Sequence, residues 1–278
     1  MTIKAPAKLN LSLNVFSQKR DDGFYPVKFL NCQLALADEI EIRPSKKTKI
    51  ICSSLKLKKE DNLVYQALRL LPKKKEIEIN IKKMISVKCG LAGGSSDAAA
   101  VLNYLNKEWG LRLSEKQLLE IGVKLGMDVC YCLIGGLCLV EGTGEKVKKL
   151  DFSLPKISLI IINPAISKRS TAWAYKNLDL QKIGKNEKKL ENLLAGIKRK
   201  DIRKIAANLH NDFEYSMSKY FPIIETIKND LINCGALRAM LCGSGLSVFG
   251  IYEDGMVAQK AYNKLKEKWE NIFLTETK

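Results

Sequence analysis

The sequence has a single histidine, His210, and no pair of cysteines spaced as C-x-x-C. Closely spaced cysteines and histidines are the usual zinc ligands, and histidine is the usual base of a hydrolytic triad. These absences argue against a dedicated metal site and against a histidine-based triad, and His210 is better explained by a local hydrogen bond. The eight cysteines, several inside apolar runs, are expected to be reduced thiols of the core.

Long apolar segments are also missing. No apolar run reaches the ~18–20 residues of a membrane span, and the N-terminus shows no basic-then-apolar signal segment. We therefore expect a cytoplasmic protein without membrane association. Its 278 residues, of which 46% are hydrophobic, can bury a substantial core and are enough for two domains.

Basic residues are in excess, with 47 Lys and Arg against 30 Asp and Glu and a net charge of +17. Such a charge can attract anionic small molecules such as ATP or a diphosphate, or a nucleic acid. The lysine-rich runs at 56–59, 73–75 and 198–200 are scattered along the chain, which is typical of solvated faces. No nucleic-acid-binding module is recognisable, so RNA binding stays only as an alternative from another functional class.

The most informative segment is a glycine-rich stretch that runs into an alanine-rich helix at residues 88–102. Gly90, Gly93 and Gly94 allow the backbone to turn and to approach an anion closely. The start of the following helix adds unpaired N–H groups and the positive end of its dipole. The segment predicts a phosphate cradle, although its spacing fits neither a Walker A loop nor a Rossmann fingerprint. The alternative is a glycine turn that merely enters a packed helix.

Three polar side chains follow these glycines. Ser95 and Ser96 carry hydroxyls at the expected helix start, where they can cap the helix, bind a phosphate oxygen or ligate Mg²⁺. Asp97 fits either a charge in the first helical turn or a second magnesium ligand. All three functions stay open at the level of the sequence.

Near the N-terminus, leucines alternate with polar residues over residues 9–15. This period of two predicts a half-buried strand, with Lys8 and Asn10 on the same face opposite the leucines. The alternative for Lys8 is an ordinary solvated lysine. Further along, Asp128 is the single acid in an apolar stretch at 122–136, and such a carboxylate needs a partner, for which a lysine is the obvious candidate.

Eight segments, in this order along nearly the whole chain, resemble the galactokinase, homoserine kinase, mevalonate kinase and phosphomevalonate kinase (GHMP) superfamily. They are residues 5–11, 22–25, 60–63, 90–98, 125–129, 141–145, 211–214 and 242–245. Within this superfamily they are most similar to the branch that phosphorylates the 2-hydroxyl of a cytidine diphosphate-linked methylerythritol, for isoprenoid synthesis by the non-mevalonate route. The resemblance implies a kinase that uses ATP and Mg²⁺ and has a small-molecule substrate.

The resemblance also implies roles for individual residues. Asp128 would accept the proton of the substrate hydroxyl, and Lys8 would keep Asp128 ionised and stabilise the transferred phosphoryl group. The ATP site would comprise Asn62, near the adenine, and Gly90, Leu91, Ala92, Gly93, Gly94, Ser95, Ser96 and Asp97, with Mg²⁺ held by Ser95, Ser96 or Asp97. The substrate site would comprise Asn10, Phe24, Tyr25, Thr171, Tyr175, Gly243, Ser244 and Gly245.

At the substrate end, the family's Asp-Gly-Tyr-His sequence reads Asp22-Gly-Phe-Tyr25 in this chain. Phe24 would still stack on the cytosine, while Tyr25 would offer main-chain groups to the base edge. Tyr175 would be the second stacking aromatic, and a two-sided stack is a plausible device for selecting the base. The alternative for Tyr175 is an aromatic of the core.

The mixed order of strand and helix patterns predicts an α+β fold. Strands are predicted at 9–15, 30–36, 39–43, 50–53, 77–81, 157–163, 239–241 and 247–252. Helices are predicted at 63–71, 96–108, 114–124, 170–177, 202–207 and 256–269, with a charged surface stretch of helix and loop at 180–200. By resemblance, residues 1–154 would form an ATP-binding domain like the second domain of ribosomal protein S5. Residues 155–278 would form a ferredoxin-like, substrate-side domain, and the cleft between the two would hold the site.

Two alternatives to this function stay open. Another GHMP-type kinase, acting on a smaller alcohol such as mevalonate or homoserine, is the alternative within the enzymes, and a non-catalytic RNA-binding relative is the more distant one. The expected assembly is a monomer or a weak homodimer without nucleic acid or membrane partners.

Overall fold

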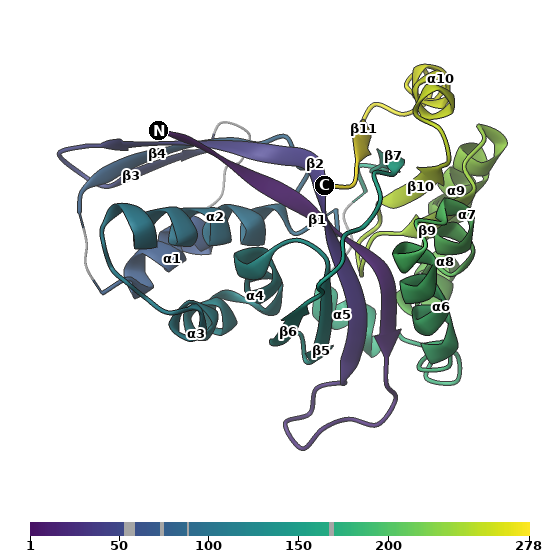
Figure 1. The fold of residues 1–278 in the computed structure, drawn as a ribbon, viewed down its shortest axis with the longest axis horizontal. Helices are drawn as coiled ribbons and strands as arrows, with labels where there is room; N and C mark the ends of the chain where they lie inside the picture. Colours follow the sequence, from purple (N-terminus) through teal and green to yellow (C-terminus); the bar gives the residue numbers. More distant parts are fainter. Residues whose placement is uncertain (53–58, 73–74, 88, 167–169) are drawn as a thin grey trace.

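The computed structural model describes residues 1–52, 59–72, 75–87, 89–166 and 170–278, and it contains two sheets. The larger sheet has the order β3-β4-β2-β1-β8; in addition, β5 pairs with β2, and β6 pairs with β5 (Figure 1). Its strands are β1 (Thr2–Val15), β2 (Val27–Pro44), β3 (Lys49–Cys52), β4 (Ile77–Lys82), β5 (Cys138–Gly142), β6 (Lys146–Lys149) and β8 (His210–Asn211).

The smaller sheet has the order β11-β7-β10-β9, and its neighbouring strands are antiparallel. It is built from the second half of the chain. Its strands are β7 (Ser158–Ile162), β9 (Arg238–Leu241), β10 (Val248–Tyr252) and β11 (Ile272–Glu276).

The helices fall into two groups (Figure 1). Those of the first half lie on one side of the large sheet: η1 (Lys59–Asp61), α1 (Leu63–Leu70), α2 (Gly93–Glu108), α3 (Glu115–Leu125) and α4 (Met127–Ile134). Those of the second half accompany the small sheet: α5 (Thr171–Lys176), α6 (Glu187–Lys198), α7 (Ile202–Ala207), α8 (Phe213–Tyr220), α9 (Ile223–Asn233) and α10 (Gly255–Leu265). None of the described helices has the length and apolar character that a membrane span requires.

The α+β fold is confirmed, and most predicted elements are present. The two strands predicted at 30–36 and 39–43 form one long strand, β2, which pairs with β1 along most of its length. Residue 53, the last of another predicted strand, lies outside the described residues. The sequence analysis missed α4, α8, α9, β5, β6, β8 and β11.

The prediction of a half-buried strand at the N-terminus is wrong, because both faces of β1 are covered. The leucines of β1 are buried, and so are Lys8, Asn10, Ser12 and Asn14. Hydrogen bonds make this burial possible: Asn10 Nδ2 donates to Asn31 Oδ1 at 2.6 Å, and the Leu30 N–H donates to Ser12 Oγ at 3.2 Å. The shared face predicted for Lys8 and Asn10 is confirmed, since Lys8 Nζ donates to Asn10 Oδ1 at 2.8 Å.

The two halves of the chain share a hydrophobic cluster. In it, Leu9 and Leu11 of β1 pack with Leu159 and Ile161 of β7. In addition, β8 from the second half pairs in parallel with β1, so the large sheet contains residues from both halves. The boundary proposed at residues 154 and 155 falls between β6 and β7, and a division into two domains there stays a prediction.

The charged stretch at 180–200 contains more buried structure than the sequence suggested. Helix α6 lies within it, and Leu190, Leu193 and Ile197 are buried. Their spacing of three and four residues places them on one face of the helix, which packs into the shared cluster.

Candidate active site

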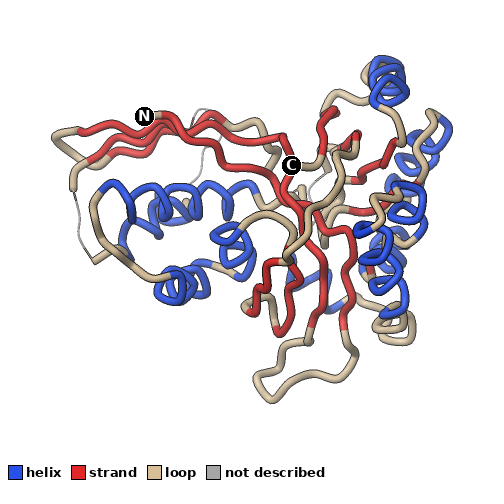
Figure 2. The backbone as a smooth tube through the Cα atoms, in the orientation of Figure 1, coloured by secondary structure: helices blue, strands red, loops and turns tan. Residues whose placement is uncertain are grey.

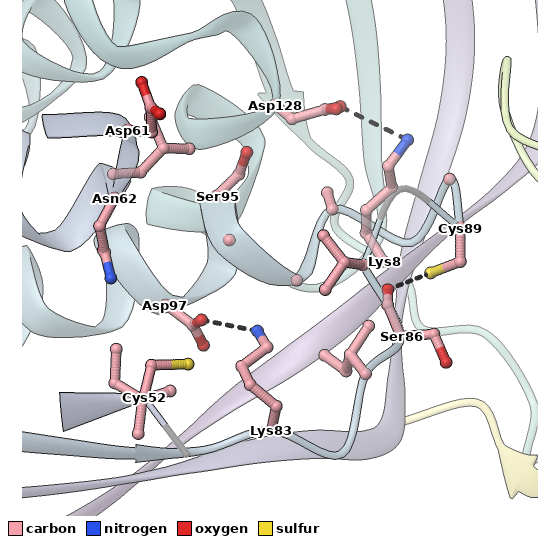
Figure 3. Close-up of a pocket in the computed structure, with 18 of the residues that line it drawn as sticks. Lys8, Cys52, Asp61, Asn62, Lys83, Ser86, Cys89, Ser95, Asp97 and Asp128 are labelled. Atoms are coloured by element: carbon pink, nitrogen blue, oxygen red, sulfur yellow. Dashed lines mark hydrogen bonds and ion pairs between the residues drawn. The ribbon is translucent and has the colours of Figure 1, made fainter. Parts of the chain in front are cut away.

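A cavity of about 560 Å³ opens beside the start of α2. It brings together segments that are far apart in the sequence (Figure 3). Its lining includes Lys8, Asp61, Asn62, Lys83, Cys89, Gly90, Ala92, Gly93, Gly94, Ser95, Asp97, Asp128, Ser170, Thr171 and Ser244. The predicted catalytic pair and most of the predicted ATP loop therefore share one hollow.

The start of α2 lacks a side-chain cap. The helix begins at Gly93, three residues earlier than predicted, and Ala92 occupies the cap position in a left-handed conformation with φ 53°. Among the described residues, no side chain accepts a hydrogen bond from the first turn of α2, so the first N–H groups stay available to an anion. The capping function considered for Ser95 and Ser96 is wrong, because the glycines before them already adopt helical conformation.

Gly90 and Gly245 lie where two loops pack closely against each other. A Cβ on Gly90 would lie 2.1 Å from the carbonyl oxygen of Cys242, and one on Gly245 would lie 2.7 Å from the carbonyl oxygen of Cys89. Neither position can therefore hold a side chain while these loops stay in contact. The segment 242–245 packs directly against the glycine loop, and its Ser244 contributes to the cavity wall.

Lys8 and Asp128 lie against each other at the cavity wall. Lys8 Nζ lies 3.4 Å from Asp128 Oδ1, and Lys8 is also held by Asn10. The lysine side chain is nearly inaccessible at 7%, whereas the Asp128 side chain is 46% exposed. The lysine partner predicted for Asp128 is confirmed. The apolar surroundings predicted for its carboxylate are wrong. Asp128 lies in the first turn of α4, where the helical period points its apolar neighbours Val129 and Tyr131 into the core.

The sequence analysis missed a second charged cluster in the cavity. Lys83, directly after β4, pairs with Asp97 Oδ2 at 2.7 Å and with the fully buried Asp38 (Figure 3 shows the Asp97 pair). Asp38 is fixed further by the N–H of Ile85, which donates to its Oδ1 at 2.8 Å. The sequence held one signal for this cluster, an aspartate that ends the apolar run of residues 34–37.

Burial is the largest influence on the pKa of Asp97 in this cluster. It raises the pKa of Asp97 to about 7, opposed by the positive charge of Lys83 and reinforced by the negative charge of Asp38. Burial alone would lower the pKa of Lys83, but its two carboxylate partners outweigh burial and raise it. Asp97 Oδ1 is buried and has no hydrogen-bond partner among the described residues. The cluster therefore keeps one unused acceptor beside the helix start.

Three residues of the predicted ATP site have defined local contacts. Ser96 is buried and donates to the carbonyl oxygen of Pro6 at 2.6 Å, so its hydroxyl is used within the protein. Leu91 points into the core, and its carbonyl accepts the Lys8 N–H at 3.1 Å. Asn62 lines the cavity and caps α1 by accepting the Val64 N–H at 2.9 Å. Of the three suggested magnesium ligands, Ser95 and Asp97 line the cavity.

Four of the predicted substrate residues, Phe24, Tyr25, Thr171 and Tyr175, lie in α5 or in the loop between β1 and β2, residues 16–26, which projects at the bottom of Figure 2. Thr171, at the first turn of α5, lines the cavity. Tyr175 lies parallel to Tyr25, with 6.2 Å between ring centroids and 8° between planes, and Phe24 is 64% exposed. The structure thus sets Tyr25 beside the predicted stacking partner Tyr175, and leaves Phe24 open to solvent.

Tyr175 also has a place in the core. It contacts Phe213 edge to face at 4.9 Å and is half-buried. Burial, followed by the negative charge of Asp128, raises the pKa of its phenol to about 12. Tyr175 is therefore a neutral aromatic side chain within electrostatic reach of Asp128.

Comparisons with known proteins agree on one superfamily. The family described as "GHMP kinases N terminal domain" matches residues 62–136, and "GHMP kinases C terminal" matches residues 193–271. A 4-diphosphocytidyl-2-C-methyl-D-erythritol kinase of Clostridium botulinum (strain Eklund 17B / Type B) is 41% identical over 289 residues, with 100% of both chains covered. The corresponding kinase of Caldicellulosiruptor saccharolyticus is 40% identical, with 100% of this chain and 97% of the relative covered.

Solved structures support the same assignment. A crystal structure of 4-(cytidine 5'-diphospho)-2C-methyl-D-erythritol kinase superposes with a TM-score of 0.84 at 26% identity, covering 100% of this chain and 99% of the other. Homoserine kinase from Cytophaga hutchinsonii superposes with a TM-score of 0.74 at 22% identity, covering 100% of this chain and 94% of the other. The second likeness shows a common fold only.

Proposed function

Because this chain belongs to the family of 4-diphosphocytidyl-2-C-methyl-D-erythritol kinases, within the GHMP kinases, we propose that the cavity beside α2 is where ATP phosphorylates the 2-hydroxyl of this substrate. The reaction supplies a phosphorylated intermediate of the non-mevalonate isoprenoid pathway. One observation carries the assignment of the site: the Lys8–Asp128 pair and the uncapped start of α2 face the same cavity.

Asp128 is the group that receives the proton of the substrate hydroxyl. Its carboxylate is accessible and lies at the cavity wall, where an incoming alcohol can reach it. Lys8 is suited to stabilise the charge of the phosphoryl group in transfer, because its ammonium is held by Asn10 and faces the reacting region. Phosphoryl transfer depends mainly on such positioning and charge stabilisation.

The glycine loop and the start of α2 bind the phosphates of ATP. The free N–H groups of the first helical turn and the helix dipole both favour an anion at this point. Asn62, which lines the cavity together with Asp61 and Leu63, is placed to contact the adenine side of the nucleotide. A Cβ on Gly94 would have no atom closer than 3.9 Å, so the backbone there is open to a ligand.

The residues at the helix start fit a magnesium ion carried in with ATP. Ser95 has a hydroxyl at the cavity wall, and Asp97 Oδ1 is an oxygen without a partner among the described residues; hard oxygen ligands of this kind suit Mg²⁺. The described residues contain no cluster of three or more His, Cys, Asp or Glu side chains that could hold a metal ion. When bound, the ion would neutralise charge on the phosphates, which would supply most of its ligands.

The substrate's cytidine end belongs near the loop 16–26. Phe24 is exposed there and free to stack on a base, and Thr171 and Ser244 face the cavity between this loop and the phosphates. We further infer a cytoplasmic enzyme that acts without nucleic acid, as a monomer or weak homodimer. None of its eight cysteines, all within the described residues, forms a disulfide, as is usual for a reducing compartment.

Replacement of Asp128 by asparagine tests the assignment of the site. We expect Asp128→Asn to lower kcat by at least about 10²-fold, because the carboxylate acts only in the transition state, and to leave the KM for ATP nearly unchanged. Steady-state kinetics with a coupled ADP assay measure both quantities. Glu141→Gln, on the nearby strand β5, is the matched control, since this carboxylate is about as exposed and does not line the cavity. A native kcat in Asp128→Asn would contradict the proposal that Asp128 accepts the proton of the substrate hydroxyl.

A further inference from the structure

The segment Asn211, Asp212, Phe213 and Glu214 has no part in the function proposed above, yet its polar side chains are almost fully engaged. Its first residue lies in β8, which pairs with β1 at Leu13. Asp212 accepts the N–H groups of Val15 and Gly184 at 2.7 and 2.9 Å, which fixes the end of β1. Glu214 accepts the Leu241 N–H at 2.9 Å. The segment thus ties β1 to β9.

Asn211 makes the contact closest to the active site. Its Nδ2 donates to the carbonyl oxygen of Leu241 at 2.9 Å and to that of Gly243 at 2.8 Å. Its Oδ1 accepts the Phe213 N–H at 3.0 Å, and the residue is only 5% exposed. The Asn211 amide group therefore bonds both to the end of β9 and to the turn that follows, residues 242–245.

This turn contacts both parts of the catalytic site. Gly243 has φ 55°, and a Cβ at this position would lie 3.2 Å from Asn10 Oδ1 and 3.7 Å from Lys8 Nζ. On the other side, the turn meets the glycine loop through the close approach of Cys242 to Gly90. Any shift of the turn is therefore transmitted to the lysine, to the asparagine that holds it, and to the phosphate loop.

We propose that Asn211 is a positioning residue for phosphoryl transfer. By holding the carbonyls of Leu241 and Gly243 together, it fixes the turn at the distance that sets Lys8 against the glycine loop. It touches neither ATP nor the alcohol, and it acts through the turn. This proposal rests on the function assigned to Lys8 and Asp128 above.

The test is Asn211→Asp, which keeps the shape of the side chain but removes both hydrogen-bond donors. We expect kcat to fall by about 10- to 100-fold, because displacements of about 1 Å around reacting groups cost rate on this scale. The KM for ATP should change by a smaller factor than kcat, because Asn211 contacts the turn and not the start of α2, whose N–H groups face the phosphates. The matched control is Asn208→Asp. In the native protein, Asn208 Nδ2 donates at 2.8 Å to the carbonyl of Lys204 in the last turn of α7, and not to the turn at 242–245.

Asn211→Ala, which introduces no charge, is the second variant, and thermal unfolding of all variants accompanies the kinetics. A fall in kcat in both Asn211 variants, well beyond that of Asn208→Asp, supports the proposal. An equal fall in kcat in Asn211→Asp and Asn208→Asp would overturn it. So would a parallel rise in the KM values of both substrates with kcat unchanged. Loss of folded protein in both Asn211 variants would also overturn it, because Asn211 would then hold the fold and not the turn. If Asp128→Asn retains full activity, the function of the site fails instead, independently of Asn211.

Discussion

At the scale of single residues, the site depends on lysines that are removed from solvent. Lys8 is held by Asn10 and Asp128, and Lys83 by Asp38 and Asp97. A buried ammonium is stable only with such partners. Both lysines reach the cavity, so their positive charges, held in place by these partners, favour an anionic nucleotide there.

The raised pKa of Asp97, about 7, makes stability depend on pH. The folded protein keeps the Asp97 proton between about pH 4 and 7, where the unfolded chain has released it, so the free energy of unfolding falls as pH rises through this window. Asp97→Asn lacks this titration. We expect the melting temperature of the variant, relative to the native protein, to rise from pH 5 to pH 8 in the absence of nucleotide. A difference in melting temperature that does not change with pH would contradict the raised pKa of the buried Asp97 carboxyl.

Phe24 is the residue predicted to stack on the cytosine base of the substrate. Stacking of an aromatic on a base is worth ~1–3 kcal/mol, so Phe24→Ala should raise the KM for the cytidine substrate by about 5- to 150-fold and leave that for ATP within about twofold. Initial rates with each substrate varied in turn give both values. Tyr25→Phe is the companion variant, because it keeps the ring that lies against Tyr175. Equal changes in the two KM values after Phe24→Ala would remove the stacking role.

At the scale of elements, the site depends on the contact between two glycine-containing loops. The glycine loop was predicted from the sequence as a phosphate cradle, and its helix start has the free N–H groups that this needs. Gly90 has a different reason to be glycine: the carbonyl of Cys242 occupies the space of a side chain. Sequence alone does not distinguish these two reasons, because the second depends on a segment about 150 residues away.

A pair of substitutions separates the two kinds of glycine. Gly90→Ala introduces a clash with Cys242 at φ 87°, and we expect a loss of more than about 1–3 kcal/mol of unfolding free energy. Gly94→Ala, where the nearest atom is 3.9 Å away and φ is ordinary, should leave the unfolding free energy nearly unchanged. Urea denaturation of both variants measures the difference. Similar stabilities for the two variants would refute the close packing of the loops.

The elements that the sequence indicated are those with strong periodicity or caps. Helix α3 follows Ser114, whose side chain forms a capping box with Gln117, and the prediction of a helix at 114–124 is confirmed within one residue. Helix α9 was missed although Ile224, Ile227 and Leu231 are spaced by three and four residues and buried. Its signal was readable, whereas the two-residue strand β8 carries none.

At the scale of the whole molecule, the sequence predicted which residues meet at the cavity better than which residues hold them in place. Lys8 and Asn10 are two residues apart on one strand, so alternation alone placed them together. The cluster of Asp38, Lys83 and Asp97 joins a strand, a loop and a helix, and only the assembled sheet brings these together. The burial of the polar face of β1 has the same origin, since other segments cover it after folding.

The central claim, phosphorylation of the 2-hydroxyl of 4-diphosphocytidyl-2-C-methyl-D-erythritol, is tested most directly by identifying the product. The purified protein would be incubated with Mg²⁺ and ATP, separately with this substrate, mevalonate and homoserine, and with an RNA-binding measurement alongside, and each product would be examined by phosphorus NMR. We predict stoichiometric ADP and a new phosphate monoester on the 2-hydroxyl of the cytidine substrate alone. Phosphorylation of mevalonate or homoserine instead, or tight RNA binding without turnover, would contradict this claim.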